Sequence, residues 1–223
     1  ESFRHIAGER LHFVEGSIMD LPLLKNCTED CRYVFHEAAL ASVPRSVAEP
    51  RLFTEVNVMG TLNVLEQARA SKVKRVMFAA SSSAYGDSPT LPKVESLPPS
   101  SKSPYAATKL AGEQYLACYS ASYGMDTASL RYFNIFGTRQ NTNSAYAAVI
   151  AAFAKALFED NSNPVIYGDG EQSRDFTFVH NAVHANLLAA RSDKPIMGQA
   201  INVACGIRVS VNELAHKMIE MVG

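Results

Sequence analysis

The chain has 223 residues, of which 47% are apolar, and its 21 basic and 22 acidic residues give a formal net charge of −1. This length and composition suffice for one domain, or for one domain with a smaller lobe, around a substantial hydrophobic core. The balanced charge lacks the basic footprint of a nucleic-acid-binding protein, and no run of about 18 apolar residues could span a membrane. We therefore expect no nucleic-acid or membrane partner, and a small neutral-to-acidic ligand.

The cysteines indicate the cellular setting. Among the four, only Cys27 and Cys31 lie close together, while Cys118 and Cys205 are distant, and no matching histidine pair follows. Neither a disulfide framework nor a zinc site is predicted. The first ten residues lack the apolar core of a signal peptide, so we expect a soluble, reducing, cytoplasmic protein.

Short β-rich runs alternate with longer helical patterns, which predicts an α/β fold with a parallel sheet covered by helices on both faces. The predicted strands are residues 11–16, 33–39, 73–82, 126–137, 163–170 with a turn, and 199–206. The predicted helices are residues 50–71, 104–123, 145–159 and 178–190, and one after Ser210 with Glu213 completing a capping box. Five prolines between positions 89 and 104 predict a loop.

Tyr105 and Lys109 form a candidate acid–base pair at the start of the helix predicted over 104–123. At a spacing of i and i+4 they share one helix face, about 5–6 Å apart at the β-carbons, although this spacing also occurs by chance. A tyrosine with a pKa near 10 needs about 4 kcal/mol of phenolate stabilisation to act as a base near neutral pH. A neighbouring ammonium group supplies part of it.

Three serines, Ser81, Ser82 and Ser83, stand at the end of the strand before this helix. Ligands of open α/β sheets bind beyond the carboxyl ends of the strands, which is where these hydroxyls fall. A serine triplet can equally form a turn or a helix cap. Facing a tyrosine–lysine helix, the serines outline a reaction site.

Six motifs in order resemble the extended short-chain dehydrogenase/reductase family: "HEAALASVPRS" from 36, "NVMGTLNVLEQA" from 57, "ASSSAYG" from 80, "YAATK" from 105, "LRYFNIFG" from 130 and "GDGEQSRDF" from 168. Within it the chain is most similar to the nucleotide-sugar 4-epimerases, especially the bacterial type acting on UDP-N-acetylglucosamine and UDP-N-acetylgalactosamine. The resemblance implies a Rossmann-type doubly wound parallel sheet with a small C-terminal substrate lobe. Residues 1–137 would form an incomplete NAD-binding domain, and residues 138–223 a segment in which the lobe alternates with returning strands of the sheet.

The resemblance also implies a mechanism. Tyr105, as phenolate, would take the proton of the sugar 4-hydroxyl while hydride passes from C4 to NAD+, and the 4-keto sugar would turn over and take the hydride back. Lys109 would lower the tyrosine pKa and bind the nicotinamide ribose. Ser81 would bridge the sugar hydroxyl and the phenol. These are the three expected catalytic residues.

The same resemblance assigns binding residues. NAD would be bound by Ile18, Asp20, Ala38, Ala39, Ala41, Asn57, Ala80, Tyr105, Lys109 and Tyr132. The UDP-sugar would be bound by Ser42, Ser81, Ser82, Asn134, Gln140, Ala148, Val149, Tyr167 and Arg174, with Asn134 and Arg174 on the diphosphate. The alanines and Asn57 could instead serve packing, and Arg174 could merely pair with Asp169 or Glu171. A homodimer through the helices over 50–71 and 104–123 is expected from the family.

The chain departs from the family pattern in three places. Ser17 stands where relatives carry an aspartate that holds the adenine, and Asp20 is the substitute considered. The glycine-rich G-x-x-G-x-x-G turn is absent, so the chain is expected to be an interior fragment, truncated at both ends, whose strand over 11–16 has no neighbour. His180 and His184 have metal-ligand spacing but no accompanying carboxylate, so no metal is predicted.

Alternatives remain open. A UDP-uronic-acid 4-epimerase or decarboxylase of the same family, or a non-catalytic nucleotide-binding Rossmann protein, would share most of these motifs. A 4,6-dehydratase is disfavoured because it needs an acid pair where this chain has Ser82 and Ser83.

Overall fold

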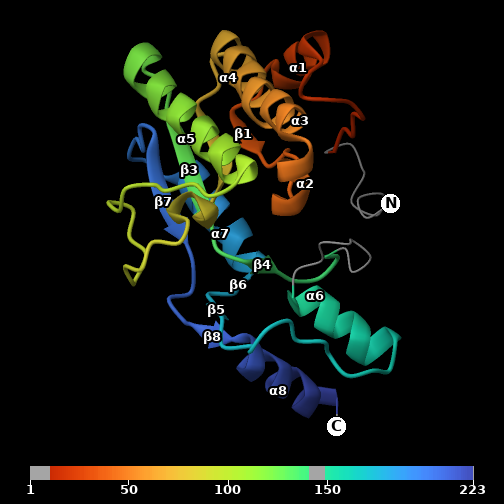
Figure 1. The fold of residues 1–223 in the computed structure, drawn as a ribbon. Coiled ribbons are helices and arrows are strands. Elements are labelled where there is room, and N and C mark those ends of the chain that lie inside the picture. Colours follow the sequence, from red (N-terminus) through yellow and green to blue (C-terminus); the bar gives the residue numbers. More distant parts are fainter. Residues whose placement is uncertain (1–10, 141–148, 223) are drawn as a thin grey trace.

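The computed structural model describes residues 11–140 and 149–222. A four-stranded parallel sheet forms the centre of the larger part of the molecule (Figure 1). In spatial order its strands are β1 (Tyr33–His36), β2 (Arg75–Ser81), β3 (Thr127–Tyr132) and β7 (Gln199–Val203). The register pairs Ser81 with Tyr132 and Tyr132 with Val203, so β2, β3 and β7 end at one level. This arrangement confirms the predicted α/β class.

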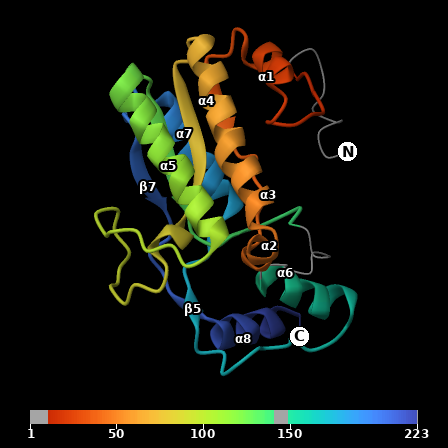
Figure 2. The ribbon, with the colours of Figure 1, turned by 45° about the horizontal axis from the view of Figure 1, so that its top comes forward.

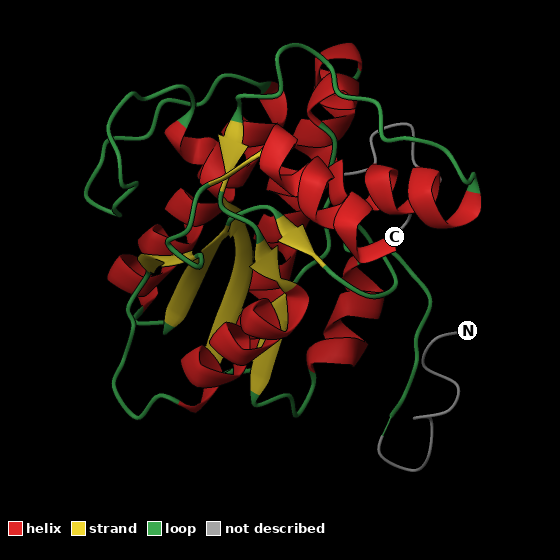
Figure 3. Ribbon diagram, turned by 90° about the horizontal axis from the view of Figure 1, so that it is seen from below, coloured by secondary structure: helices red, strands yellow, loops and turns green. Residues whose placement is uncertain are grey.

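Helices cover both faces of the sheet (Figure 3). On one face α4 (Gly60–Ala70) and α5 (Pro104–Tyr123) lie side by side (Figure 2). The helix predicted over 50–71 is one continuous run, because α3 (Pro50–Thr54) and the π-helical η1 (Glu55–Met59) lead directly into α4. On the other face lies α7 (Val179–Arg191).

Strand β2 contributes to two hydrophobic cores at once. Val76 and Phe78 pack with Leu65 and Leu116 under α4 and α5, whereas Met77 packs with residues under α7. Alternate residues of a strand point to opposite faces, so a strand between two helical layers is apolar throughout. All residues of β2 up to Ala80 are accordingly buried.

Local signals define where α5 begins and ends. The Ser103 hydroxyl accepts a 3.1 Å hydrogen bond from the Ala106 amide, and Pro104 occupies the first helical position. At the other end Gly124 adopts the left-handed conformation, with φ of +65°, that stops a helix. The predicted capping box of α8 (Val211–Val222) is confirmed, since Ser210 and Glu213 exchange hydrogen bonds of 2.8 and 3.1 Å.

A smaller lobe lies beyond the carboxyl end of the sheet, in the lower half of Figure 1. Its core joins Phe153, Val211 and Ala215. The lobe and its connections contain β4 (Ile135–Phe136), α6 (Val149–Ala154), η3 (Lys155–Glu159), β5 (Ser173–Arg174), β6 (Thr177–Phe178), β8 (Val209–Ser210) and α8. Strand β4 pairs with β6, and β5 pairs with β8. The remaining short elements are α1 (Leu21–Thr28), α2 (Val43–Ala48) and the 3₁₀ turn η2 (Ser82–Tyr85).

Two predicted strands are wrong. Residues 11–16 are exposed and carry no strand, and residues 163–167 carry none either, although the turn at 168–170 forms. A strand needs a hydrogen-bonded neighbour, and in the described part of the chain neither segment lies in a ladder. The strand predicted over 126–137 is divided into β3 and β4, and the first residues of the helix predicted over 145–159 lie outside the described residues.

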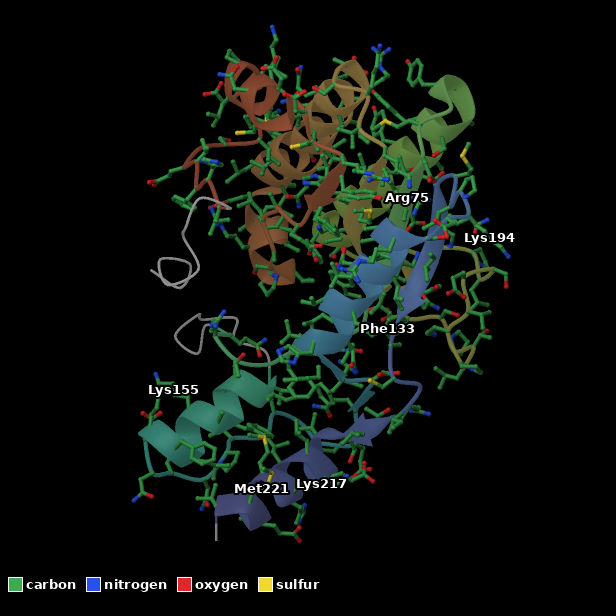
Figure 4. The ribbon with its side chains drawn as sticks, turned by 180° about the vertical axis from the view of Figure 1, so that it is seen from behind. Arg75, Phe133, Lys155, Lys194, Lys217 and Met221 are labelled. Carbon is green, nitrogen blue, oxygen red and sulfur yellow. The ribbon has the colours of Figure 1, made fainter. Side chains whose placement is uncertain are left out.

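A buried arginine ties the sheet to the end of α7. The Arg75 guanidinium pairs with Asp126 at 2.6 Å and donates to the carbonyls of Ala189, Ser192 and Lys194. Arg75 and Lys194 lie close together in Figure 4.

None of the helices described is long and apolar enough to cross a bilayer.

Candidate active site

A cleft of about 1320 Å³ opens between the carboxyl end of the sheet and the smaller lobe. Its lining comes from the loops after β1, β2 and β3, from the start of α5, and from β5 with the turn before β8. Of the predicted site residues it is lined by Ala39, Ala41, Ala80, Ser81, Ser82, Tyr105, Lys109, Tyr132, Asn134 and Arg174. Tertiary structure thus brings ten of them to one surface from five separate parts of the chain.

The serine turn orients the Ser81 hydroxyl. Ser81 Oγ accepts from the Ser83 hydroxyl at 2.8 Å and from the Ser83 amide at 3.2 Å. A hydroxyl has two acceptor lone pairs and one hydrogen to donate. Both acceptor positions of Ser81 are therefore used, and its own hydrogen remains to be donated to a group facing it.

Tyr105 is the group that faces Ser81. It is the second residue of α5, in the first turn, where unpaired amides favour a negative charge. Burial raises the pKa of its phenol, and the hydrogen bond with Ser81 opposes that shift. A hydroxyl that donates to a phenolate stabilises it, so Ser81 acts in the direction required of a base.

Lys109 lies one turn further along α5 and is 5% exposed. Its ammonium donates a 2.8 Å hydrogen bond to the Ala79 carbonyl and lies 5.0 Å from the Phe78 ring centre. Burial lowers its pKa to about 8, and the Glu37 carboxylate opposes this. Burial is the largest influence on the pKa of Tyr105, and the Lys109 ammonium donates to the Ala79 carbonyl, so the expected lowering of the Tyr105 pKa by Lys109 stays a prediction.

A polar chain that the sequence reasoning missed crosses the floor of the cleft. The Tyr132 hydroxyl donates to Glu37 at 2.8 Å, and Asn186 Nδ2 donates to the Tyr132 oxygen at 2.5 Å. Burial raises the pKa of Glu37, while this bond and the Lys109 charge oppose the rise. The chain fixes the Tyr132 ring at the end of β3. The position of Glu37 near the carboxyl end of the strand predicted over 33–39 was the available signal.

Several residues assigned to NAD have other partners. Asp20 caps α1 by accepting from the Leu23 amide at 3.1 Å, and the Ile18 side chain packs against Gly60 of α4. Neither they nor Ala38 line the cleft.

Asn57 is buried and does not line the cleft either. Its side-chain oxygen accepts from the Leu40 amide at 2.8 Å, and its nitrogen donates to the Leu40 carbonyl and to Thr108. Asn57 thus ties the loop after β1, which carries Ala39 and Ala41, to α5.

The residues assigned to the nucleotide end extend into a second cavity of about 330 Å³. Val149 and Tyr167 line it, and Asn134, Ile135 and Arg174 line both cavities, so the two adjoin. Gln140 lies at the β4 turn and donates to the Ile135 carbonyl at 3.4 Å, and Ser42 caps α2. Ala148 lies outside the described residues.

Arg174 is free for a ligand rather than paired with a neighbouring acid. Its guanidinium donates to the Ser173 carbonyl at 2.9 Å, and no ion pair involves it among the residues described. Glu171 instead accepts from Asn212. A second arginine, Arg208, lines the same cleft and donates to the Ser173 hydroxyl; nothing in the motifs pointed to it.

The residues present fit a dinucleotide and a diphosphate. Small side chains at Ala39, Ala41 and Ala80 allow close backbone approach, the Ser81–Tyr105–Lys109 set faces the same space, and exposed guanidinium groups lie at the far end. Within the described residues no cluster of three metal-ligating side chains occurs.

Comparison with known proteins gives the same family. The family model described as "NAD dependent epimerase/dehydratase family" matches residues 1–204. The UDP-glucose 4-epimerase of Mycolicibacterium smegmatis is 37% identical over 218 residues, covering 96% of this chain and 68% of that protein.

Two solved structures are similar throughout. The UDP-N-acetylglucosamine 4-epimerase of Methanobrevibacter ruminantium, solved with UDP-N-acetylmuramic acid, has a TM-score of 0.91 and 43% identity, covering 96% of this chain and 67% of that one. The UDP-glucose 4-epimerase of Thermus thermophilus, solved with NAD, has a TM-score of 0.87 and 33% identity, covering 99% and 72%.

The chain spans 66% and 68% of the length of two curated relatives that it matches. The matched family model covers most of the chain, and the solved relatives share its Rossmann fold. This chain belongs to the NAD dependent epimerase/dehydratase family.

Proposed function

We propose that this chain carries the catalytic site of an NAD-dependent UDP-sugar 4-epimerase that interconverts UDP-N-acetylglucosamine and UDP-N-acetylgalactosamine. The observation that carries the proposal is the Ser81–Tyr105–Lys109 set facing one cleft with Arg174 at its far end. NAD+ supplies a hydride acceptor that can return the hydride to the same carbon, so the reaction has no net redox change. Ala39, Ala41, Ala80, Lys109 and Tyr132 would hold it.

Proton transfer falls to Tyr105. Its phenolate would take the proton of the sugar 4-hydroxyl as C4 loses its hydride and the 4-keto sugar forms, and the phenol would return that proton after the sugar has turned over. Ser81 donates its one available hydrogen toward the phenol oxygen, which stabilises the phenolate form. Lys109 adds positive charge on the same helix face and holds the end of β2 in place through Ala79.

Substrate binding falls to the lobe side of the cleft. Arg174 offers a planar fork of donors to a diphosphate, and Asn134 stands beside it. The second cavity, with Val149 and Tyr167, accepts the base. Small side chains at Ala41 and Ser82 leave room for an N-acetyl group on the sugar.

The test uses the full-length protein with added NAD+ and three substrates: UDP-N-acetylglucosamine, UDP-glucose and UDP-glucuronic acid. Product formation is followed by chromatography. We expect conversion of the acetylated sugar with the highest kcat/KM, and a loss of at least a hundredfold in Ser81→Ala and Tyr105→Phe. A preference for UDP-glucose or UDP-glucuronic acid would contradict the assignment of an acetylated substrate. No turnover of any of the three sugars would contradict the proposed epimerase activity.

The homodimer is also a proposal. It would use the outer faces of α4 and α5, where Tyr115 and Tyr123 are 37% and 55% exposed. The mass of the full-length protein in solution tests it, and a monomer at micromolar concentration would contradict it.

A further inference from the structure

A buried ion pair lies directly behind the candidate site. Arg131 Nε donates to Glu113 Oε2 at 2.9 Å and Nη2 donates to Oε1, and the two side chains are only 5% and 6% exposed. A buried pair of this kind contributes little net stability compared with apolar side chains of the same size. Its remaining contacts therefore matter more than the pair itself.

The third donor of the guanidinium starts a directional chain. Arg131 Nη1 donates to the Tyr85 hydroxyl at 2.8 Å, and that hydroxyl donates to Asn202 Oδ1 at 2.7 Å. Asn202 Nδ2 then donates to the Lys93 carbonyl at 3.0 Å, and the backbone N–H of Asn202 donates to the Glu95 carboxylate at 2.8 Å. The direction of each hydrogen bond is therefore defined along the whole series.

Tyr85 lines the cleft, yet its hydroxyl has no hydrogen left for a substrate. It accepts from Arg131 and donates to Asn202, so it is not a candidate acid or base. Its ring is 1% exposed and packs 6.1 Å from the Phe133 ring. What Tyr85 contributes to the site is therefore position.

This series of hydrogen bonds runs beside each element that carries a candidate catalytic residue. Glu113 lies two helical turns beyond Tyr105 on α5, with Lys109 between them. Arg131 is in register with Ala80, the residue before Ser81. Tyr85 ends the turn that Ser81 begins.

At its Asn202 end, this series of hydrogen bonds reaches the loop over 86–103, which forms one wall of the cleft. The loop over 86–103 contributes Asp87, Leu91, Pro92, Lys93 and Lys102 to the lining. Asn202 binds this loop through its hydrogen bonds to the Lys93 carbonyl and the Glu95 carboxylate. Close to the serine turn, the Ser100 amide donates to the Ala84 carbonyl at 2.7 Å.

We propose that Tyr85 and Asn202 are positioning residues that hold the loop over 86–103 as a fixed wall of the substrate cleft and align the serine turn with α5. The substrate part of this inference rests on the proposed epimerase function. The loop part does not, because it concerns contacts within the chain alone.

The test compares Tyr85→Phe with Tyr33→Phe in the full-length protein. Both remove one hydroxyl, but Tyr33 begins β1, at the opposite end of the sheet from the cleft, and does not line the cleft. We expect Tyr85→Phe to speed hydrogen exchange of the amides over 86–103 about tenfold more than exchange of the β2 amides, which report any loss of overall stability, and Tyr33→Phe to leave exchange over 86–103 unchanged. Unchanged exchange in Tyr85→Phe would overturn the proposal.

Kinetics and a second variant extend the test. In Tyr85→Phe the KM for the UDP-sugar should rise about tenfold while NAD+ affinity stays within twofold. Asn202→Ala should act alike, and the double variant should add little to either single one, since both cut one chain. Additive effects would overturn the shared role. Absence of turnover in the wild type would contradict the epimerase but leave the exchange result to decide the loop.

Discussion

Lys109 and Ala79 join α5 to β2, because the Lys109 ammonium donates a 2.8 Å hydrogen bond to the Ala79 carbonyl two residues before Ser81. The lysine reaches this carbonyl through the packed space between α5 and β2, beside the Phe78 ring. Burial of an ammonium group is costly, and here the cost appears as a pKa lowered to about 8.

This burial makes stability depend on pH. Between pH 8 and 10.5 the unfolded chain holds the Lys109 proton and the folded chain does not, so stability from this group rises with pH in that window. The wild type should gain about 3 kcal/mol over Lys109→Met between those limits, measured by urea unfolding without added ligands. The exposed Lys217→Met is the control. Parallel pH curves for the wild type and Lys109→Met would contradict the buried position.

Tyr105 should be protonated near neutral pH when no cofactor or substrate is added. Burial raises the pKa of its phenol, and Ser81 opposes that rise. Ultraviolet difference spectra of the wild type against Tyr105→Phe should show no phenolate below about pH 10. Ser81→Ala should move the midpoint higher still. A phenolate signal near pH 7, or a lower midpoint in Ser81→Ala, would contradict this arrangement.

Arg174→Ala should weaken substrate binding more than it slows chemistry. A hydrogen bond to a charged group is worth about 1.5–3 kcal/mol, so KM should rise roughly 10- to 100-fold with kcat nearly unchanged. Steady-state kinetics with the UDP-sugar measures both constants. The exposed Arg191 on α7 lies away from the cleft, and Arg191→Ala should change neither. A fall in kcat at unchanged KM would place Arg174 in the chemical step instead.

Arg75→Met should destabilise the fold by about 3–5 kcal/mol, because it leaves Asp126 unpaired and removes donors from three carbonyls at the end of α7. Denaturant unfolding measures the loss. Arg45→Met breaks an exposed pair with Glu49 and should have little effect. Equal losses in the two variants would show that the Arg75 network contributes no special stability.

The sequence alone determined the features that depend on neighbouring residues. Ser103, Pro104 and Gly124 define α5, and the apolar run of β2 marks a strand buried on both faces. The i, i+4 spacing of Tyr105 and Lys109 needs only a helix, so the pair was found before its surroundings were known. The serine turn followed in the same way from its place at the end of a strand.

Tertiary structure decided what depends on distant partners. The segments over 11–16 and 163–167 have strand-like sequences, but a strand forms only where another strand supplies hydrogen bonds. Asn57 was assigned to the cofactor, and only the fold shows its amide tied to Leu40 and Thr108.

For the same reason the sequence did not predict the series of hydrogen bonds from Glu113 to Asn202, or which group the Lys109 ammonium would bind. Each depends on groups that are far apart in sequence and are brought together by packing. Local spacing places a side chain on an element, whereas its pKa and its partner are set by the neighbours that the fold supplies.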